Sequence, residues 1–186
     1  MKIHYTKTAK LFHWLIATII LGLFVLGFTM ADMEISPEKL QYFSWHKWAG
    51  VTVFLLTIAR LTWRLLNPPP ALPEMMDDRI KLLAHLGHFG LYFLCIIIPI
   101  SGWLMSSAKG VQTVWFGILP IPDVLSRDKE LGHQLEELHS ALNWVFIAFI
   151  STHVLAALKH HFIDKDEILI RMLPKFLIAK PRNENV

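Results

Sequence analysis

Cysteine is nearly absent from this sequence of 186 residues, which contains Cys95 and no other. A single cysteine cannot form an intramolecular disulfide, so we expect no disulfide framework. The sequence also lacks a C-x-x-C-H motif, which excludes covalent attachment of a c-type haem. The fold must therefore be held together by packing, and any large prosthetic group must be bound noncovalently.

Charged residues are also scarce, because Asp, Glu, Lys and Arg make up 18% of the chain while 54% of it is hydrophobic. Four stretches are nearly free of charge and long enough to cross a hydrocarbon layer of about 30 Å at about 1.5 Å per residue. We therefore predict an all-α integral membrane protein built as a four-transmembrane-helix bundle. The predicted helices are 11–31, 44–66, 82–108 and 138–158, in a single membrane domain 1–186 that ends in a basic tail, 159–186.

The sequence also predicts the structure of the longest connection and of the tail, and the fate of the first span. The stretch 109–137 contains Gly117, Pro120 and Pro122, so its first half is expected to be irregular, with a helical second half that leads into the fourth span. Within the tail, an amphipathic segment near 168–176 is expected to lie on the membrane surface. The first span is expected to remain uncleaved, because its apolar run is longer than that of a secretory signal.

Lysine and arginine are distributed unevenly between the two sides of such a bundle. Thirteen of the 18 fall in the N-terminus, around the connection between the second and third helices, or in the tail. The positive-inside rule places these segments, and with them both termini, in the cytoplasm. The net charge of +3 is therefore interpreted as membrane topology, and no nucleic-acid partner is expected.

The ten histidines are unusual in so apolar a chain. His139 and His153 lie 14 residues apart in the fourth predicted helix, so they share a face to within ~40° and are separated by ~21 Å along the axis. One helix face thus presents an imidazole near each membrane surface. This spacing would hold two haem irons stacked across a bilayer.

Partners for these two histidines are found by comparing the depth in the membrane at which the other histidines are expected. His46 begins the second helix on the outer side, at the level of His139, and His13 begins the first helix on the cytoplasmic side, at the level approached by His153. Two pairs result, His46 with His139 and His13 with His153. Each pair joins two helices at one level, as bis-imidazole ligation of a b haem requires.

Other residues at these levels have candidate roles in cofactor binding. Gly27 lies 14 residues after His13, and Gly50 lies one turn from His46, where a porphyrin edge needs close approach to the backbone. Arg60 lies 14 residues after His46 and would face a haem propionate at the cytoplasmic level. The alternatives are ordinary helix packing for the two glycines and a snorkelling topology anchor for Arg60.

The third helix supplies competing histidines. His85 and His88 begin at the cytoplasmic side, so either could replace His13 or His153 as a ligand. We instead assign them a role in support of the haem ligands or in a quinone site, with Lys159 and His160 nearby at the same surface, because quinone reduction needs hydrogen-bond donors and a proton path. A metal-transport site is disfavoured, since the histidine pairs are ~21 Å apart and neither has a carboxylate or thiolate nearby within the membrane.

Several motifs resemble the bacterial cytochrome b561 family, over nearly the whole chain. They are Phe12-His13-Trp14, the His46 opening of the second helix, Arg60-Leu61-x-x-Arg64, Ala84-His85-Leu86-Gly87-His88, the fourth helix with His139, His153 and His160-His161, and Arg171-Met172-Leu173-Pro174. The resemblance implies a multi-pass protein of the bacterial inner (cytoplasmic) membrane with two noncovalent b haems and electron exchange with the quinone pool. Family members of this single-subunit type are superoxide oxidases, which take an electron from superoxide at the periplasmic side and reduce ubiquinone.

The expected function is therefore electron transfer by an oxidoreductase, superoxide:ubiquinone oxidoreductase, and no separate catalytic residue is assigned. Expected partners are membrane lipid, quinone and a small anionic donor such as superoxide. The alternative is a haem-bearing anchor subunit that carries electrons for a soluble dehydrogenase, although the short outer loops offer little docking surface. A homodimer or a redox partner subunit remains an open alternative.

Overall fold

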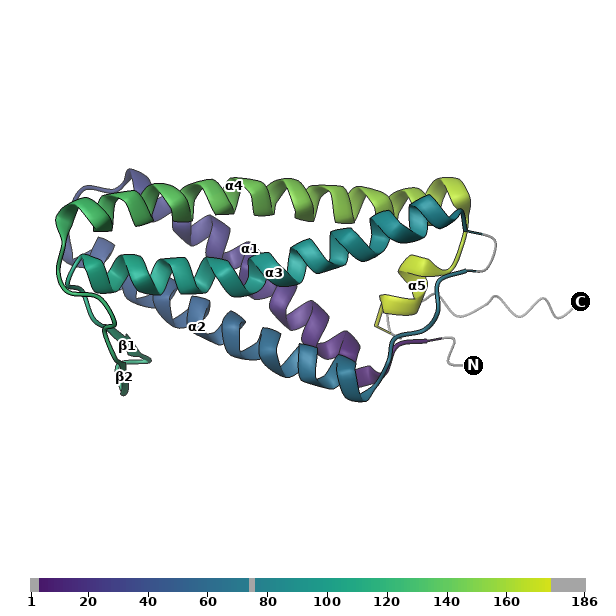
Figure 1. Cartoon of the computed structure of the whole chain (residues 1–186), viewed down its shortest axis with the longest axis horizontal. Helices are drawn as coiled ribbons and strands as arrows, with labels where there is room; N and C mark the ends of the chain where they lie inside the picture. Colours follow the sequence, from purple (N-terminus) through teal and green to yellow (C-terminus); the bar gives the residue numbers. More distant parts are fainter. Residues whose placement is uncertain (1–3, 74–75, 175–186) are drawn as a thin grey trace, which may run out of the picture.

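The computed structural model describes residues 4–73 and 76–174, and four long helices dominate it (Figure 1). They are α1 (Lys7–Asp32), α2 (Pro37–Leu66), α3 (Asp78–Ala108) and α4 (Lys129–Lys159). Each is long and apolar enough to cross a membrane. The prediction of an all-α bundle with four membrane-spanning helices is confirmed.

Each long helix begins earlier than the sequence predicted, because a polar first turn precedes its apolar stretch. Ser36 Oγ accepts a hydrogen bond from the backbone N–H of Lys39 at the start of α2, and Asp128 Oδ1 accepts one from that of Leu131 at the start of α4. Such caps satisfy amide groups that have no partner within the helix. The helices therefore extend beyond the hydrophobic run from which they were predicted.

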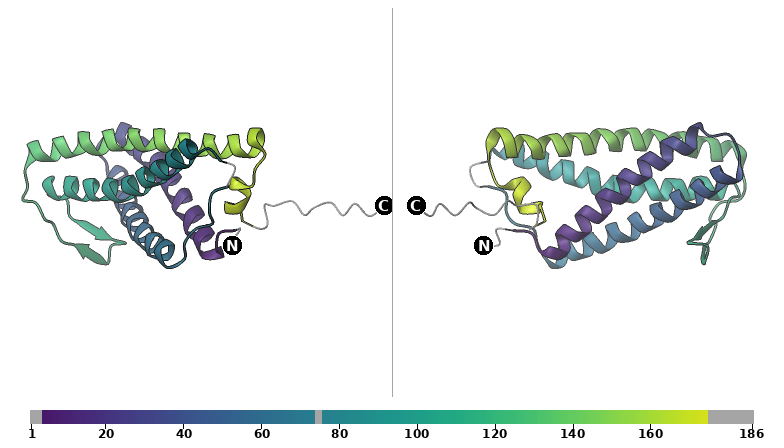
Figure 2. Two further views of the ribbon diagram at one scale, coloured as in Figure 1. Left: turned by 45° about the vertical axis from the view of Figure 1, so that its right-hand side comes forward. Right: turned by 180° about the vertical axis from the view of Figure 1, so that it is seen from behind.

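The helices pack mainly as two antiparallel pairs, α1 with α2 and α3 with α4, with a further contact between α2 and α3. Figure 2 shows α1 running obliquely across the bundle, while α3 and α4 follow its long axis. The interior of the bundle lies between the α1–α2 pair and the α3–α4 pair, so helices from the two halves of the sequence face each other there.

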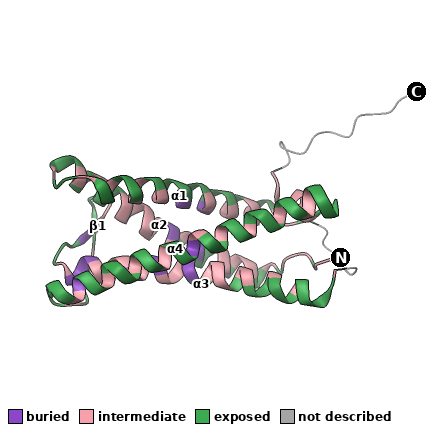
Figure 3. Cartoon of the chain, turned by 90° about the horizontal axis from the view of Figure 1, so that it is seen from above, coloured by how far each residue is buried: buried purple, intermediate pink, exposed green. Residues whose placement is uncertain are grey.

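A layer of buried hydrocarbon side chains, the central apolar layer, fills the middle of this interior (Figure 3). It consists of Ile16, Ile20, Val53, Leu94, Ile98 and Phe146. Phe146 is seven residues, about two helical turns, from both His139 and His153. The layer therefore lies midway between the two levels at which the histidines occur.

One end of the bundle is closed by the short helix α5 (Ile168–Met172). The helix α4 first continues as a π-helical turn, η1 (His160–Asp164). The indole Nε1 of Trp14 donates to the carbonyl of Met172 over 3.0 Å, and the guanidinium of Arg171 donates to the carbonyl of Ala71 over 3.1 Å. The start of α1, the linker before α3 and α5 thus meet at what we term the α5 end. The surface segment predicted at 168–176 extends to residues 175 and 176, outside the described residues.

The opposite end carries a small β-hairpin where an irregular connection was expected. The strands β1 (Thr113–Trp115) and β2 (Leu119–Ile121) pair antiparallel, with Thr113 opposite Ile121. Pro120 lacks a backbone N–H, which two-stranded edge pairing tolerates. The expectation of irregular structure here was wrong for this stretch, while the predicted helical second half is the start of α4. We refer to this end as the hairpin end.

Candidate functional site

The first histidine pair lies at the hairpin end, between the two helix pairs. His46 of α2 and His139 of α4 have ring centroids 6.4 Å apart and ring planes inclined by 75°. The sequence placed these two residues at one level, and the structure brings them together across the interior of the bundle.

The second pair lies at the α5 end. His13 of α1 and His153 of α4 have ring centroids 6.2 Å apart and planes inclined by 71°. Because both pairs use α4, their separation follows from the 14 residues between His139 and His153, which is ~21 Å of helix.

The ring separations suit one metal atom held between two imidazoles. Two metal–nitrogen bonds of about 2 Å, plus about 1 Å from each nitrogen to its ring centre, separate two ring centres by about 6 Å. Both pairs have this spacing, and among the described residues the donors at each level are imidazoles without an acidic ligand. The donor set therefore fits a b-type haem iron better than a structural zinc ion.

The surroundings of the pair at the hairpin end orient the ring of His139. Ser101 of α3 is buried, donates its hydroxyl hydrogen to the carbonyl of Ile98 over 2.8 Å, and lies 2.9 Å from His139 Nδ1. Since that hydroxyl hydrogen is already used, Ser101 accepts from the Nδ1–H of His139. This arrangement places the proton on Nδ1 and leaves Nε2 of His139 with its lone pair, ready to bind a metal.

Glycines allow close approach to both rings of this pair. A Cβ at Gly102 would lie 3.1 Å from the ring of His139, and one at Gly27 would lie 3.4 Å from the ring of His46. Nδ1 of His46 is buried without a hydrogen-bond partner among the described residues. A methyl group at Gly50 would meet no atom within 4 Å in the described part of the chain, so Gly50 borders open space. Room and an unused ring nitrogen are thus both present beside the pair.

The pair at the α5 end has a third histidine beside it. His88 of α3 lies with its ring 5.5 Å from that of His153, compared with 6.2 Å for His13. The structure therefore keeps both His13 and His88 within reach of His153.

Positive charge surrounds this level of the bundle. Arg60 interacts electrostatically with His13, His88 and His153, as the sequence placement suggested. Its Nε donates to the phenol oxygen of Tyr92 over 2.9 Å, and the guanidinium carbons of Arg60 and Arg64 lie 5.7 and 5.9 Å from the Tyr92 ring centre. Two arginines held over one aromatic ring suit binding of carboxylate groups.

A cavity of about 590 Å³ opens next to these residues. Its polar lining includes Arg64, Lys81, His85, His88 and Tyr92, and the remainder is mainly apolar and proline-rich. His85 Nδ1 donates to the carbonyl of Lys81 over 2.6 Å, since a carbonyl oxygen can only accept. The cavity thus combines apolar walls with several hydrogen-bond donors, as ligand pockets commonly do.

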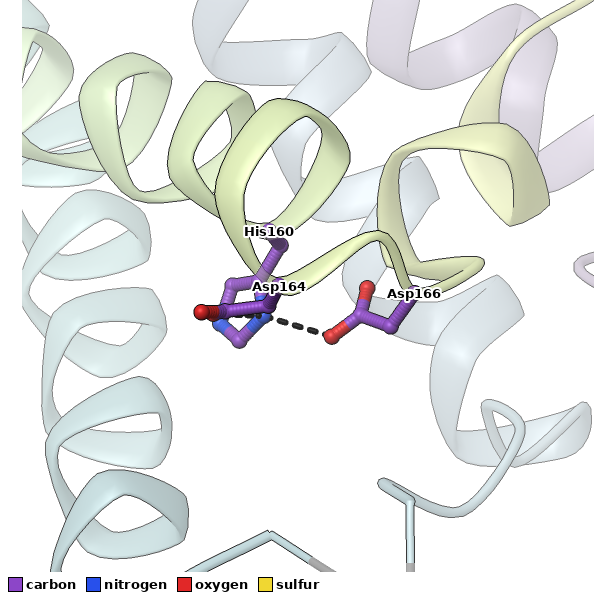
Figure 4. Close-up of side chains that lie close together, drawn as sticks. All are labelled: His160, Asp164 and Asp166. Carbon is purple, nitrogen blue, oxygen red and sulfur yellow. Dashed lines mark hydrogen bonds and ion pairs between the residues drawn. The ribbon is translucent and has the colours of Figure 1, made fainter.

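Lys159 and His160, which the sequence grouped with this site, are bound elsewhere. Figure 4 shows His160 beside Asp164 and Asp166. The imidazole Nδ1 of His160 lies 2.6 Å from Asp166 and 3.2 Å from Asp164, and the ammonium of Lys159 lies 2.6 Å from Asp164. The side chains of Lys159 and His160 are therefore already bound to the carboxylates of Asp164 and Asp166. Neither Lys159 nor His160 lines the cavity that contains His85 and His88.

Comparison with known proteins agrees with this arrangement. The family model for prokaryotic cytochrome b561 matches residues 4–175. The chain belongs to the prokaryotic cytochrome b561 family. It is a multi-pass protein of the bacterial inner membrane and a b-type cytochrome of electron transport, which confirms the resemblance seen in the sequence.

Individual relatives cover most of the chain. The chain is 35% identical to cytochrome b561 homolog 2 of Escherichia coli K12 over 178 residues, which cover 92% of each protein. It is 30% identical to the probable superoxide oxidase CybB of Yersinia pestis over 168 residues, covering 88% of this chain and 92% of the relative. It is 26% identical to cytochrome b562 of Cereibacter sphaeroides over 176 residues, covering 91% and 94%.

Three residues of the site were not singled out from the sequence. Gly102 lies 14 residues after His88, so the spacing that selected Gly27 would have selected it as well. Tyr92 lies four residues after His88 and thus on the same face of α3. For Ser101 the sequence gives no comparable signal, because its contact with His139 depends on how α3 is rotated against α4.

Proposed function

We propose that this cytochrome binds two b haems and transfers electrons across the membrane, from a one-electron donor at the hairpin end to ubiquinone at the α5 end. The observation that carries the proposal is the presence of two cross-bundle histidine pairs with ring separations of 6.4 and 6.2 Å. When bound, haem iron supplies reversible one-electron exchange, and the protein adjusts it through ligands, burial and charge.

The roles proposed for the chain's own residues follow their placement. His46 and His139 hold one iron, and His13 and His153 hold the other. Gly27, Gly50 and Gly102 leave room for the porphyrin at the hairpin end. Arg60, oriented by Tyr92, binds a propionate at the α5 end, where its charge is also partly compensated by that carboxylate.

The cavity lined by His85 and His88 is the proposed quinone site. Reduction of a quinone requires hydrogen bonds to its carbonyl oxygens and delivery of protons, which imidazoles can provide near neutral pH. With Nδ1 of His85 bound to the Lys81 carbonyl, its Nε2 is the atom left for this role. Lys159 and His160 are not included, because their side chains are bound to Asp164 and Asp166.

The proposed orientation places the α5 end and both termini in the cytoplasm, since most lysine and arginine residues lie at that end.

Superoxide is the proposed donor at the periplasmic side, supported by the name of the Yersinia relative. The cations nearest the hairpin end are engaged, since Lys109 is 2.8 Å from Glu136 and Lys47 donates to the Gln112 carbonyl over 3.1 Å. The charge of Lys109 is therefore paired with a carboxylate, whereas Lys47 binds a neutral carbonyl and keeps a positive charge that superoxide would meet.

Haem content and electron transfer by the isolated chain test this function. Purified protein should contain about two low-spin b haems per chain by pyridine haemochrome assay. In proteoliposomes, superoxide should reduce these haems, and a short-chain ubiquinone should reoxidise them. One haem per chain would refute the paired-ligand scheme. A requirement for a co-purifying subunit would instead support the anchor-subunit alternative.

Removal of an imidazole from the cavity should separate quinone chemistry from haem binding. We expect His85→Ala to retain both haems and an unchanged visible spectrum, while quinone-dependent reoxidation slows by about 10²-fold, the low end of the usual contribution of one acid–base group. Stopped-flow reoxidation of prereduced protein measures this rate. His161→Ala is the matched control, since it changes a histidine at the same end outside the cavity lining. Equal rates in both variants would exclude His85 from the site.

Loss of the Ser101 hydroxyl should change the electronic properties of one haem. Donation from Nδ1–H makes a ligating imidazole more basic and favours the oxidised iron. We expect Ser101→Ala to raise the midpoint potential of the haem at the hairpin end by roughly 20–60 mV, the equivalent of about 0.5–1.5 kcal/mol for one hydrogen bond. Redox titration provides the measurement, and Ser44→Ala, a serine on α2 whose hydroxyl donates to the carbonyl of Leu40, provides the control. An unchanged potential would show that Ser101 does not act through His139.

A further inference from the structure

The β1–β2 hairpin belongs to a segment with an unusual composition for a loop outside the membrane. Residues 111–122 contain no charged side chain, and eight of these twelve residues are Val, Ile, Leu, Trp, Phe or Thr. Loops surrounded by water usually carry charged and polar side chains, and an exposed apolar patch commonly marks a contact with a partner or a membrane. The composition thus indicates that this hairpin is not surrounded by water alone.

The tip of the hairpin presents apolar side chains to its surroundings. Phe116 is 54% exposed and Ile118 84% exposed, with Leu119 beside them also exposed. Phe116 has a φ of 51° and Gly117 a φ of 71°, the left-handed conformations of a tight hairpin turn. A phenylalanine is disfavoured in this conformation, yet here it holds a half-exposed aromatic ring in the turn of the hairpin.

The hairpin is fixed against the side of α2. Trp48 Nε1 donates to the carbonyl of Val114 over 2.6 Å, and Trp115 Nε1 donates to the carbonyl of Trp48 over 3.2 Å. The ring of Phe116 lies 5.4 Å from that of Trp48. Figure 1 shows the hairpin projecting sideways from the bundle beside α2.

The level of attachment places the hairpin near the membrane boundary. Trp48 opens the charge-free part of α2, which runs from residue 48 to residue 59, and Lys47 precedes it. A charged residue followed by tryptophan and a long apolar stretch is typical of the boundary between headgroups and hydrocarbon. The hairpin is therefore level with the start of the lipid-facing surface of α2 and continuous with it.

We propose that the tip of this hairpin inserts into the outer boundary of the lipid bilayer, with Phe116 and Ile118 among the upper acyl chains. Two features favour lipid over a second protein as the partner: the segment offers no charge for specific pairing, and it adjoins a surface that already faces lipid. The indole N–H groups of Trp48 and Trp115 are bound within the protein, so these two rings can enter an apolar layer without leaving their own N–H donors unpaired.

Accessibility of a nitroxide spin label at Ile118 tests the proposal in intact protein reconstituted into phosphatidylcholine–phosphatidylglycerol nanodiscs. The label is attached to Ile118→Cys in a Cys95→Ser background, and retention of the haem spectrum verifies folding. Power saturation compares collisions with oxygen, which partitions into lipid, and with a water-soluble nickel chelate. We expect an oxygen-to-nickel ratio several-fold higher than at Ser126→Cys, an exposed position in the loop that follows.

The same measurement at Leu119→Cys provides a second site if the first variant does not fold. Ratios equal to that of Ser126 at both positions would place the hairpin in water and overturn the proposal. Exclusion of both reagents would place protein there instead of lipid, and dipolar broadening between labels would identify that protein as a second copy of the chain.

Discussion

Replacement of His139 by alanine should remove the haem at the hairpin end and leave the other haem in place. The imidazole of His139 is one of only two ring ligands that the described structure offers at this level, with its ring centroid 6.4 Å from that of His46. An iron that loses one ligand becomes five-coordinate, and its porphyrin is held less firmly. The pyridine haemochrome ratio should fall from about two to about one per chain.

The pairing itself is tested by a second variant. His46→Ala should deplete the same haem, with the same change in the low-temperature visible spectrum, because the two residues belong to opposite sides of one site. His133→Ala is the control, since this histidine lies at the start of α4 and is largely exposed. If His46→Ala and His139→Ala removed different haems, the proposed pairing would be wrong.

Replacement of His13 should remove the haem at the α5 end, whereas replacement of His88 should not. The ring separation of 6.2 Å between His13 and His153 matches that of the pair at the hairpin end, while 5.5 Å between His88 and His153 is shorter. His88 also lines the cavity proposed for quinone. We therefore expect His13→Ala to lower haem content to about one per chain, and His88→Ala to keep about two low-spin haems while slowing reoxidation by quinone.

Electron paramagnetic resonance of the oxidised protein distinguishes these outcomes, because a lost axial ligand converts a low-spin signal into a high-spin one. The reverse result, with two intact low-spin haems in His13→Ala and a high-spin signal in His88→Ala, would make α3 the source of the ligand. The two-haem proposal would survive that result, and the assignment of His13 would not.

Much of this architecture could be predicted because the regular geometry of a helix relates residues that are many positions apart in the sequence. The 14-residue interval between His139 and His153 fixes both their common face and their separation, and the order of helices fixes which other histidines share each level. The structure brings His46 to His139 and His13 to His153 for this reason. The four-helix fold was predictable because charge-free runs of this length have few other stable solutions.

Helical periodicity could not predict contacts that depend on the direction of a side chain or on irregular backbone. His160 was grouped with His85 and His88 because all three lie near the same membrane surface, yet the π-helical turn there brings it to Asp166. The contact of Tyr92 with Arg60 was not predicted, because it requires a particular rotation of α3 against α2. The hairpin was missed because two proline residues masked strands of three residues each.

The central apolar layer has a consequence for energy conversion. Its six side chains are hydrocarbon, so none of them can relay a proton, whereas an electron can tunnel through packed matter of this kind. In the proposed direction, each turnover moves negative charge toward the cytoplasm, against the usual inside-negative voltage, at a cost of about 2.3 kcal/mol per electron for each 100 mV. The rate in sealed vesicles should therefore rise when an ionophore collapses that voltage, which would make this small bundle a consumer of the membrane potential.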